Sequence, residues 1–211
     1  MMMKAKKKLY ILLTDTGTWL SRTIKLYTRE PLNHASLAFD SQLCEVYSFG
    51  RKYEGNPFLG GFVRENIRSR LFLNRRRQTP CAIYVCEVEA DAYARIREWV
   101  LQMARLEHAY KYNALGLFGV ALGFKIEREN AYFCSQFVAS AFLAGGVKLT
   151  DKEPAFVTPA DLGRSDRIRL VYKGTLQEYP PLYAVQNQSE RAASGGFVRL
   201  VGMAEAGSSG Q

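Results

Sequence analysis

The strongest constraint on the fold is a change of hydrophobic period near residue 90. Residues 81–88 alternate apolar and other side chains, and this period of two predicts a β-strand. The following run, residues 90–107, has near-helical spacing of its large apolar side chains, Tyr93, Ile96, Val100, Met103 and Leu106. That spacing predicts an amphipathic helix. We therefore expect an α+β protein in which a sheet packs against helices.

Two further strand patterns lie in the first 50 residues. Residues 8–13 form an apolar run, and residues 34–39 alternate small or polar with apolar side chains. A short turn leads to residues 45–49, so the segment predicts an antiparallel hairpin. The remaining predicted elements are helices at 18–27, 113–122 and 133–144, a strand at 168–172, and a Gly-, Asn- and Pro-rich loop at 50–61. Gly145-Gly146 is expected to end the helix at 133–144.

The length of 211 residues fits one domain. We assign residues 1–184 to that domain and residues 185–211, rich in Ser, Gly, Ala, Gln and Glu, to a flexible tail. The apolar run at residues 9–13 follows lysines, but it is shorter than the core of a signal peptide. No run approaches the length of a membrane span. We therefore expect a cytoplasmic protein.

The net charge of +9 points to anionic partners. The basic residues concentrate at two places, Lys4, Lys6, Lys7 and Lys8, and then Arg68, Arg70, Arg75, Arg76 and Arg77. A solvated basic face explains this pattern as well as an anionic substrate or a peripheral contact with an anionic membrane does. No nucleic-acid-reading motif accompanies the arginines, so nucleic acid is not an expected partner.

Cys134 and His34 are the candidate catalytic residues. Cys134 stands at the start of a predicted helix, where the helix dipole and free amide groups stabilise a thiolate and can bind an oxyanion. A buried structural cysteine is the alternative. His34 opens a strand among small residues, whereas His108 lies among charged residues and is expected to be exposed. The other cysteines, Cys44, Cys81 and Cys86, fall in strand-like runs and are expected in the core.

Metal binding is not expected from this composition. The Cys81-x4-Cys86 spacing lacks a second pair of ligands, and the chain has only two histidines. We therefore predict no metal and no cofactor.

Two segments resemble the signature segments of a known family. Leu32-Asn33-His34-Ala35-Ser36-Leu37 and the segment from Tyr132 to Val138, with the sequence YFCSQFV, are similar to those of the permuted NlpC-type papain-like enzymes, the YaeF/YiiX group. Here the histidine precedes the cysteine, which is the permuted order, and the pattern spans roughly residues 9 to 180. The resemblance implies a circularly permuted papain-like fold with Cys134 as nucleophile and His34 as base.

The family also has a polar residue that orients the histidine from the following strand. Glu45 occupies the matching place, and Tyr47 and Ser48 are the alternatives if the strand register differs. Three tyrosines are candidates for lining the substrate pocket, namely Tyr47, Tyr110 and Tyr112.

The resemblance implies a cysteine hydrolase that cleaves an amide, ester or thioester through an acyl-enzyme on Cys134. An amidase or peptidase acting on a small peptide is the leading hypothesis. An acyltransferase acting on lipid at a membrane surface stays open, because lecithin–retinol acyltransferase-like proteins share the permuted order. A non-enzymatic binding module that keeps the fold also stays open. The oligomeric state is not predicted.

Overall fold

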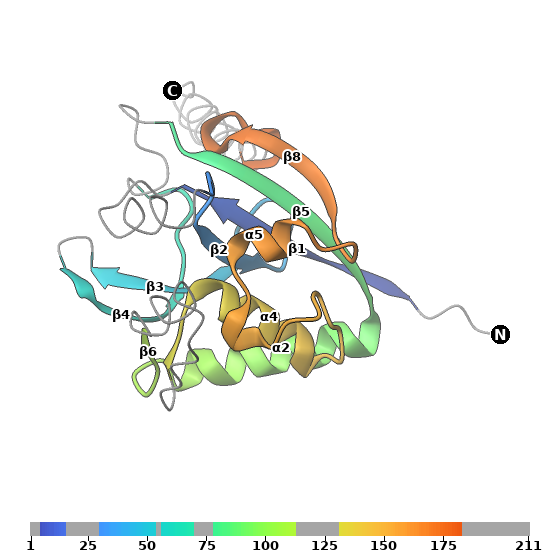
Figure 1. Cartoon of the computed structure of the whole chain (residues 1–211), viewed down its shortest axis with the longest axis horizontal. Helices are drawn as coiled ribbons and strands as arrows, with labels where there is room; N and C mark the ends of the chain where they lie inside the picture. The colour runs from blue at the N-terminus through green and yellow to red at the C-terminus, as the bar shows by residue number, and fades with distance from the viewer. Residues whose placement is uncertain (1–4, 16–29, 54–55, 70–77, 113–130, 183–211) are drawn as a thin grey trace, which may run out of the picture.

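The computed structural model describes residues 5–15, 30–53, 56–69, 78–112 and 131–182. Its centre is a six-stranded antiparallel sheet in the order β4-β3-β2-β1-β5-β8 (Figure 1). The strands are β1 (Lys6–Thr14), β2 (His34–Ala38), β3 (Val46–Tyr53), β4 (Asn56–Arg64), β5 (Pro80–Glu89) and β8 (Arg169–Thr175). The α+β class and the strands predicted around residues 8–13, 34–39, 45–49, 81–88 and 168–172 are confirmed.

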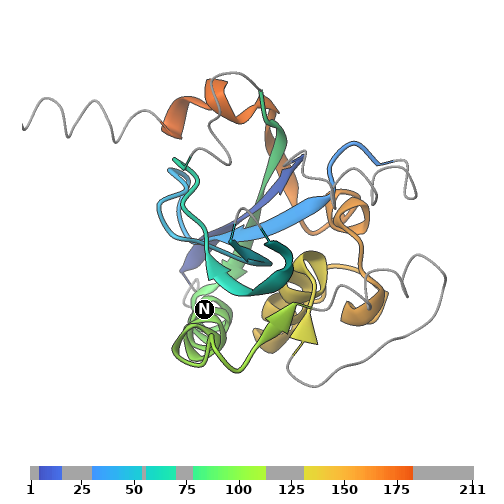
Figure 2. The same cartoon turned by 90° about the vertical axis from the view of Figure 1, so that its left-hand side faces the viewer.

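Two helices, α2 (Ala90–Arg105) and α4 (Cys134–Ala144), pack side by side on one face of the sheet, as Figures 1 and 2 show. The alternation along β1 directs Leu9, Ile11 and Leu13 into the core shared with these helices. The helix α2 buries Ala92, Ile96, Val100 and Met103. Its amphipathic pattern is thus confirmed, although Leu106, just beyond the helix, is 58% exposed.

The opposite face of the sheet carries a second apolar cluster. Leu12 of β1 and Ile83 of β5 pack there against Leu176, Tyr179 and Leu182. These last three come from the short helix η2 (Leu176–Glu178) and the residues after it. Both faces of the central strands are therefore covered. Within the described ranges, no helix is long and apolar enough to cross a membrane.

The end of α4 depends on two glycines. Gly146 has a φ of +78°, a left-handed conformation that glycine adopts without strain. A Cβ added to Gly145 would lie 2.5 Å from Cγ1 of Ile96, so only glycine permits this close approach of α4 to α2. The predicted stop at Gly145-Gly146 is confirmed.

The prediction of a loop at residues 50–61 is wrong. Residues 50–53 complete β3 and residues 56–61 belong to β4, with Gly50 opposite Gly61 and Arg51 opposite Gly60. Glycine, asparagine and proline are typical of loops, but here cross-strand pairing sets the backbone, with an irregularity between Arg51 and Tyr53.

The turn between β2 and β3 is fixed by Asp40. Its carboxylate accepts hydrogen bonds from the backbone N–H groups of Cys44 (3.0 Å) and Glu45 (2.8 Å). Leu43 in this turn has a φ of 56°. The turn sets the register of the hairpin, in which Leu37 lies opposite Tyr47. Cys44 is exposed in it, so its predicted place in the core is wrong.

Several small elements were not predicted. They are β6 (Lys111–Tyr112), which pairs with β7 (Ala131–Tyr132), the short helix η1 (Pro154–Phe156), and α5 (Pro159–Gly163). The helices predicted at 18–27 and 113–122 and the tail predicted at 185–211 lie outside the described residues.

Candidate active site

Cys134 is the first residue of α4 and is 3% exposed. The side chain of Gln136 turns back to the helix start, where its Oε1 accepts a hydrogen bond from the N–H of Phe133 (3.4 Å). The next N–H groups have no carbonyl partner within the helix, because the first intrahelical bond runs from Phe137 to Phe133. One of them, the N–H of Ser135, helps to lower the pKa of the Cys134 thiol.

His34 lies where the strand β2 begins, beside an irregularity in its pairing with β1. The N–H of Asn33 donates to the carbonyl of Thr14 (3.1 Å), although Thr14 is already the strand partner of His34. Two residues of this segment therefore face one residue of β1, as in a β-bulge. Bulges change the direction of the neighbouring side chain. The imidazole of His34 makes a side-chain hydrogen bond with Cys134.

The sheet opens between β2 and β3 beside this pair. The N–H of Phe39 donates across to the carbonyl of Glu45, so the alternate N–H groups of β2, including that of Ala35, point toward β3. Pairing between the two strands covers Leu37 and Ala38 but does not reach Ala35. The N–H of Ala35 instead contributes to lowering the pKa of the Cys134 thiol. The gap in the ladder thus supplies a donor to the thiolate.

Glu65, directly after β4, completes the cluster. Its carboxylate lies 2.7 Å from Nε2 of His34 and accepts hydrogen bonds from the hydroxyls of Ser36 (2.8 Å) and Ser48 (2.5 Å). The side chains of His34 and Glu65 are 15% and 6% exposed. Because Nε2 faces Glu65, Nδ1 is the ring nitrogen that faces Cys134. The structure therefore connects a thiol, an imidazole and a carboxylate in one chain of hydrogen bonds.

The electrostatics of the three groups reinforce one another. Burial alone lowers the pKa of His34, but the charge of Glu65 and the hydrogen bonds to Cys134 and Glu65 reverse this effect and raise the pKa to about 10. Burial raises the pKa of the Cys134 thiol, but His34 and the N–H groups of Ala35 and Ser135 lower it below its ordinary value. Burial likewise opposes ionisation of Glu65, yet His34 and the two serines hold its pKa below the ordinary value. All three shifts favour the charged forms, an imidazolium between a thiolate and a carboxylate, relative to the same groups in water.

Glu45, the residue expected to orient His34, is engaged elsewhere. Its carboxylate accepts hydrogen bonds from Arg97 on α2 (2.9 Å) and from the hydroxyl of Tyr47 (3.1 Å). The expectation that Glu45 orients His34 is therefore wrong. Glu45 ends the turn before β3, on the side of α2, whereas the carboxylate that reaches His34 comes from one strand further along the sheet. The hydroxyl of Ser48, one of the alternatives, donates its hydrogen bond to Glu65 and not to the imidazole.

The structure describes the side chains of two of the three candidate substrate-lining tyrosines. Tyr47 is 4% exposed and stacks on Phe62 with the ring centroids 5.6 Å apart, so it belongs to the core and its predicted place in a substrate pocket is wrong. Tyr110 is partly buried against Phe49. The backbone of Tyr112 lies in β6, and its side chain lies outside what the structure describes.

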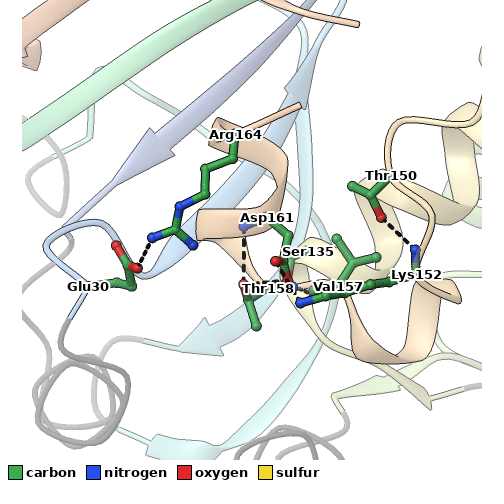
Figure 3. A network of polar contacts seen from close by, with 8 residues as sticks. All are labelled: Glu30, Ser135, Thr150, Lys152, Val157, Thr158, Asp161 and Arg164. Atoms are coloured by element: carbon green, nitrogen blue, oxygen red, sulfur yellow. Dashed lines mark hydrogen bonds and ion pairs between the residues drawn. The ribbon is translucent and has the colours of Figure 1, made fainter. Parts of the chain in front are cut away.

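A polar network supports the start of α4 (Figure 3). The hydroxyl of Ser135 donates to the carbonyl of Val157 (2.7 Å). The next residue, Thr158, caps α5 by accepting a hydrogen bond from the N–H of Asp161 (3.2 Å), and Asp161 accepts one in return from the Thr158 N–H (2.9 Å). Arg164 at the end of α5 pairs with Glu30 (2.5 Å), four residues before His34. The α5 segment thus contacts both chain segments that carry the candidate pair.

The remaining histidine and cysteines differ from this pair. The side chain of His108 is 91% exposed, as expected. Cys81 and Cys86 are buried on β5, also as expected, and burial raises their pKa to about 12 and about 11. Among the described residues, no group of three or more His, Cys, Asp or Glu side chains could hold a metal ion.

Sequence reasoning missed Glu65 because the strand that delivers it was taken for a loop. The apolar pair Phe62-Val63 stands just ahead of it, and Phe62 is buried in the core, but two residues are too few to predict a strand. Comparison with known proteins gives no further guide to the site, because no family model and no curated protein matches the chain.

Proposed function

We propose that the protein is a cysteine-dependent hydrolase that cleaves an amide, ester or thioester of a small peptide or acyl compound. The observation that carries the proposal is the continuous hydrogen-bonded series Cys134, His34 and Glu65, with the cysteine at a helix N-terminus. An inert core cysteine needs no such partners. Burial raises the pKa of the two thiols on β5, whereas the pKa of the Cys134 thiol is lowered.

The proposed reaction begins with attack of the Cys134 thiolate on the substrate carbonyl carbon. The carbonyl oxygen becomes an oxyanion, which the free N–H groups at the start of α4 stabilise. The His34 imidazolium then donates its Nδ1 proton to the leaving group, and the acyl group stays on the sulfur. In the second half, His34 takes a proton from water, the resulting hydroxide attacks the acyl carbon, and the sulfur departs as thiolate. Glu65 stays ionised and fixes the ring so that Nδ1 faces the sulfur.

The same contacts support the permuted papain-like arrangement suggested by the two sequence segments. The strand with His34 precedes the helix with Cys134 in the chain, and the strand start meets the helix start. The third residue is also polar and comes from another strand of the same sheet. It is Glu65, directly after β4, and not the Glu45 that the family pattern suggested.

The direct test is capture of the acyl-enzyme. The full chain is mixed with p-nitrophenyl acetate, nitrophenol release is followed, and the protein is digested for mass mapping. We expect a burst of nitrophenol and an acetyl group on the Cys134 peptide, both absent in Cys134→Ala. Cys44→Ala is the matched control, because Cys44 is exposed and its thiol contacts the carbonyl of Gln42 and the guanidinium of Arg68. Acetylation of Cys44 alone, with no burst, would support a binding module in place of an enzyme.

The acceptor of the acyl group separates hydrolysis from acyl transfer. Adding an amine or alcohol during turnover gives an acylated product only if the acceptor competes with water at the acyl-enzyme. We propose water as the acceptor, so the yield of free acid should stay unchanged as the added acceptor increases.

A further inference from the structure

The Glu65 carboxylate receives more hydrogen bonds than the orientation of a histidine requires. One oxygen accepts from Ser36 on β2, and the other accepts from Ser48 on β3 while it also contacts His34. Both serines are 0% exposed, so neither hydroxyl exchanges its partner for bulk water. Small polar side chains are seldom buried in central strands without a specific partner, and here both share the same one.

We propose that Ser36 and Ser48 are positioning residues that hold Glu65 as an anion facing His34, and so keep the transferable proton on the imidazole ring. This inference rests on the proposed function and adds to it two residues and a role. Neither serine touches the sulfur in any described hydrogen bond. Both act through Glu65.

The physical argument compares two locations of one proton. With the proton on His34, the pair is imidazolium and carboxylate, and each serine hydroxyl donates to a full negative charge. With the proton on Glu65, the pair is neutral and the same hydroxyls donate to a weaker acceptor. Hydrogen bonds to a charged acceptor are roughly twice as strong as those between neutral groups. The two serines therefore favour the ionised pair selectively, which in turn favours the thiolate.

The other charged or titratable groups around the cluster do not replace this effect. The helix α4 contributes Cys134 and no other ionisable side chain. On β3, the hydroxyl of Tyr47 is bonded to Glu45. On the remaining side, Arg64, Arg68 and Cys44 line a hollow that also includes Glu65. Arg68 is held there by a hydrogen bond to the carbonyl of Leu182 (2.9 Å), whereas the Glu65 carboxylate contacts His34 and the two serines.

The experiment reads the protonation of His34 directly. The protein is labelled with ¹⁵N-histidine, which gives signals from two residues, and the exposed His108 serves as an internal reference. In the unmodified protein, the His34 ring should stay an imidazolium until the pH approaches about 10. In Ser36→Ala/Ser48→Ala, the acid-side change of the His34 Nε2 signal, which reports protonation of Glu65, should move up by at least about one pH unit, because each lost bond to a charged group is worth about that much. The pH below which alkylation of Cys134 slows should rise in parallel, because a protonated Glu65 no longer stabilises the imidazolium.

Two comparisons make the outcome decisive. Ser165→Ala also removes a serine hydroxyl contact, the partly buried bond to the Leu149 carbonyl (2.6 Å), but should leave His34 and Cys134 unchanged. If the double variant does not fold, Ser36→Ala and Ser48→Ala are measured singly, each with a smaller shift in the same direction. Unchanged His34 titration in folded variants overturns the inference even if Cys134 remains reactive. If Cys134 is inert in the unmodified protein, the proposed function itself fails.

Discussion

Cys134 at the start of α4 and the two cysteines of β5 are all buried, yet the pKa of the Cys134 thiol is lowered and those of the other two are raised. On β5, Cys81 and Cys86 lie between apolar neighbours, and desolvation raises their pKa. At the start of α4, the same desolvation is overcome by an imidazolium and two backbone N–H groups. Burial therefore does not decide whether a cysteine is inert. The decisive factor is whether the fold places donors and a compensating charge around the sulfur.

We expect the largest effect in selective alkylation of the cysteines. In the Cys44→Ala background, limited iodoacetamide treatment at about pH 7 should modify Cys134 first, because only the thiolate reacts. Cys134→Ala should abolish the labelling and lower any turnover by at least about a thousandfold. Cys81→Ala should leave both unchanged. Preferential modification of Cys81 or Cys86, read by mass mapping, would contradict the contrast.

The second test compares two glutamates that differ in their partners. Glu65→Gln keeps the size of the side chain but removes the charge facing His34, so kcat/KM should fall by about 10- to 100-fold, the value of a hydrogen bond between charged groups. Glu45→Gln removes the charge facing Arg97 and should leave kcat/KM within about twofold. Steady-state kinetics on a chromogenic ester would measure both. Equal losses in the two variants would remove Glu65 from its special role.

The third test uses pH. Because the pKa of His34 is raised, its imidazolium and the associated stability are fully present below its ordinary pKa and are lost as the pH rises through about 10. Because the pKa of Cys134 is lowered, the thiolate persists below the ordinary thiol value of 9.0. We expect a bell-shaped profile of kcat/KM whose alkaline limb falls about tenfold per pH unit above pH 10. A limb near the ordinary value for histidine would show that Glu65 does not sustain the ion pair.

The smallest expected effect concerns the support of α4. Thr158→Ala removes the side-chain cap of α5 and should lower the free energy of unfolding by about 1 kcal/mol in urea titration. Arg164→Ala breaks an ion pair whose arginine is 68% exposed, so its effect on stability should be smaller. A large fall in the alkylation rate of Cys134 in a Thr158→Ala variant that is still folded would contradict this expectation. It would show that α5 helps to position the cysteine as well as to stabilise the fold.

The sequence predicted the elements whose local pattern agrees with their tertiary setting. The strand at residues 81–88, the helix from residue 90 and the glycine stop after α4 are of this kind, and Cys134 and His34 were identified from their positions in such elements. Glu65 was not. Its role depends on the pairing of β3 with β4 through glycines, which local composition assigns to a loop. The family pattern indicates Glu45, on the strand after the histidine, but a carboxylate can reach His34 only from the side where the sheet places it.

The Asp40 turn has a consequence for how the site can change. It fixes which residues of β3 lie beside β2. The length of the turn therefore determines whether Ser48 faces Glu65, although Ser48 lies several residues away from the turn. Adding one residue to the turn would reverse the facing of every side chain on one strand, exchanging Ser48 for the buried Tyr47 or Phe49. An even-numbered change would restore the facing but displace Ser48 along the strand. The length of this exposed turn is therefore as much a part of the site as the buried groups it aligns.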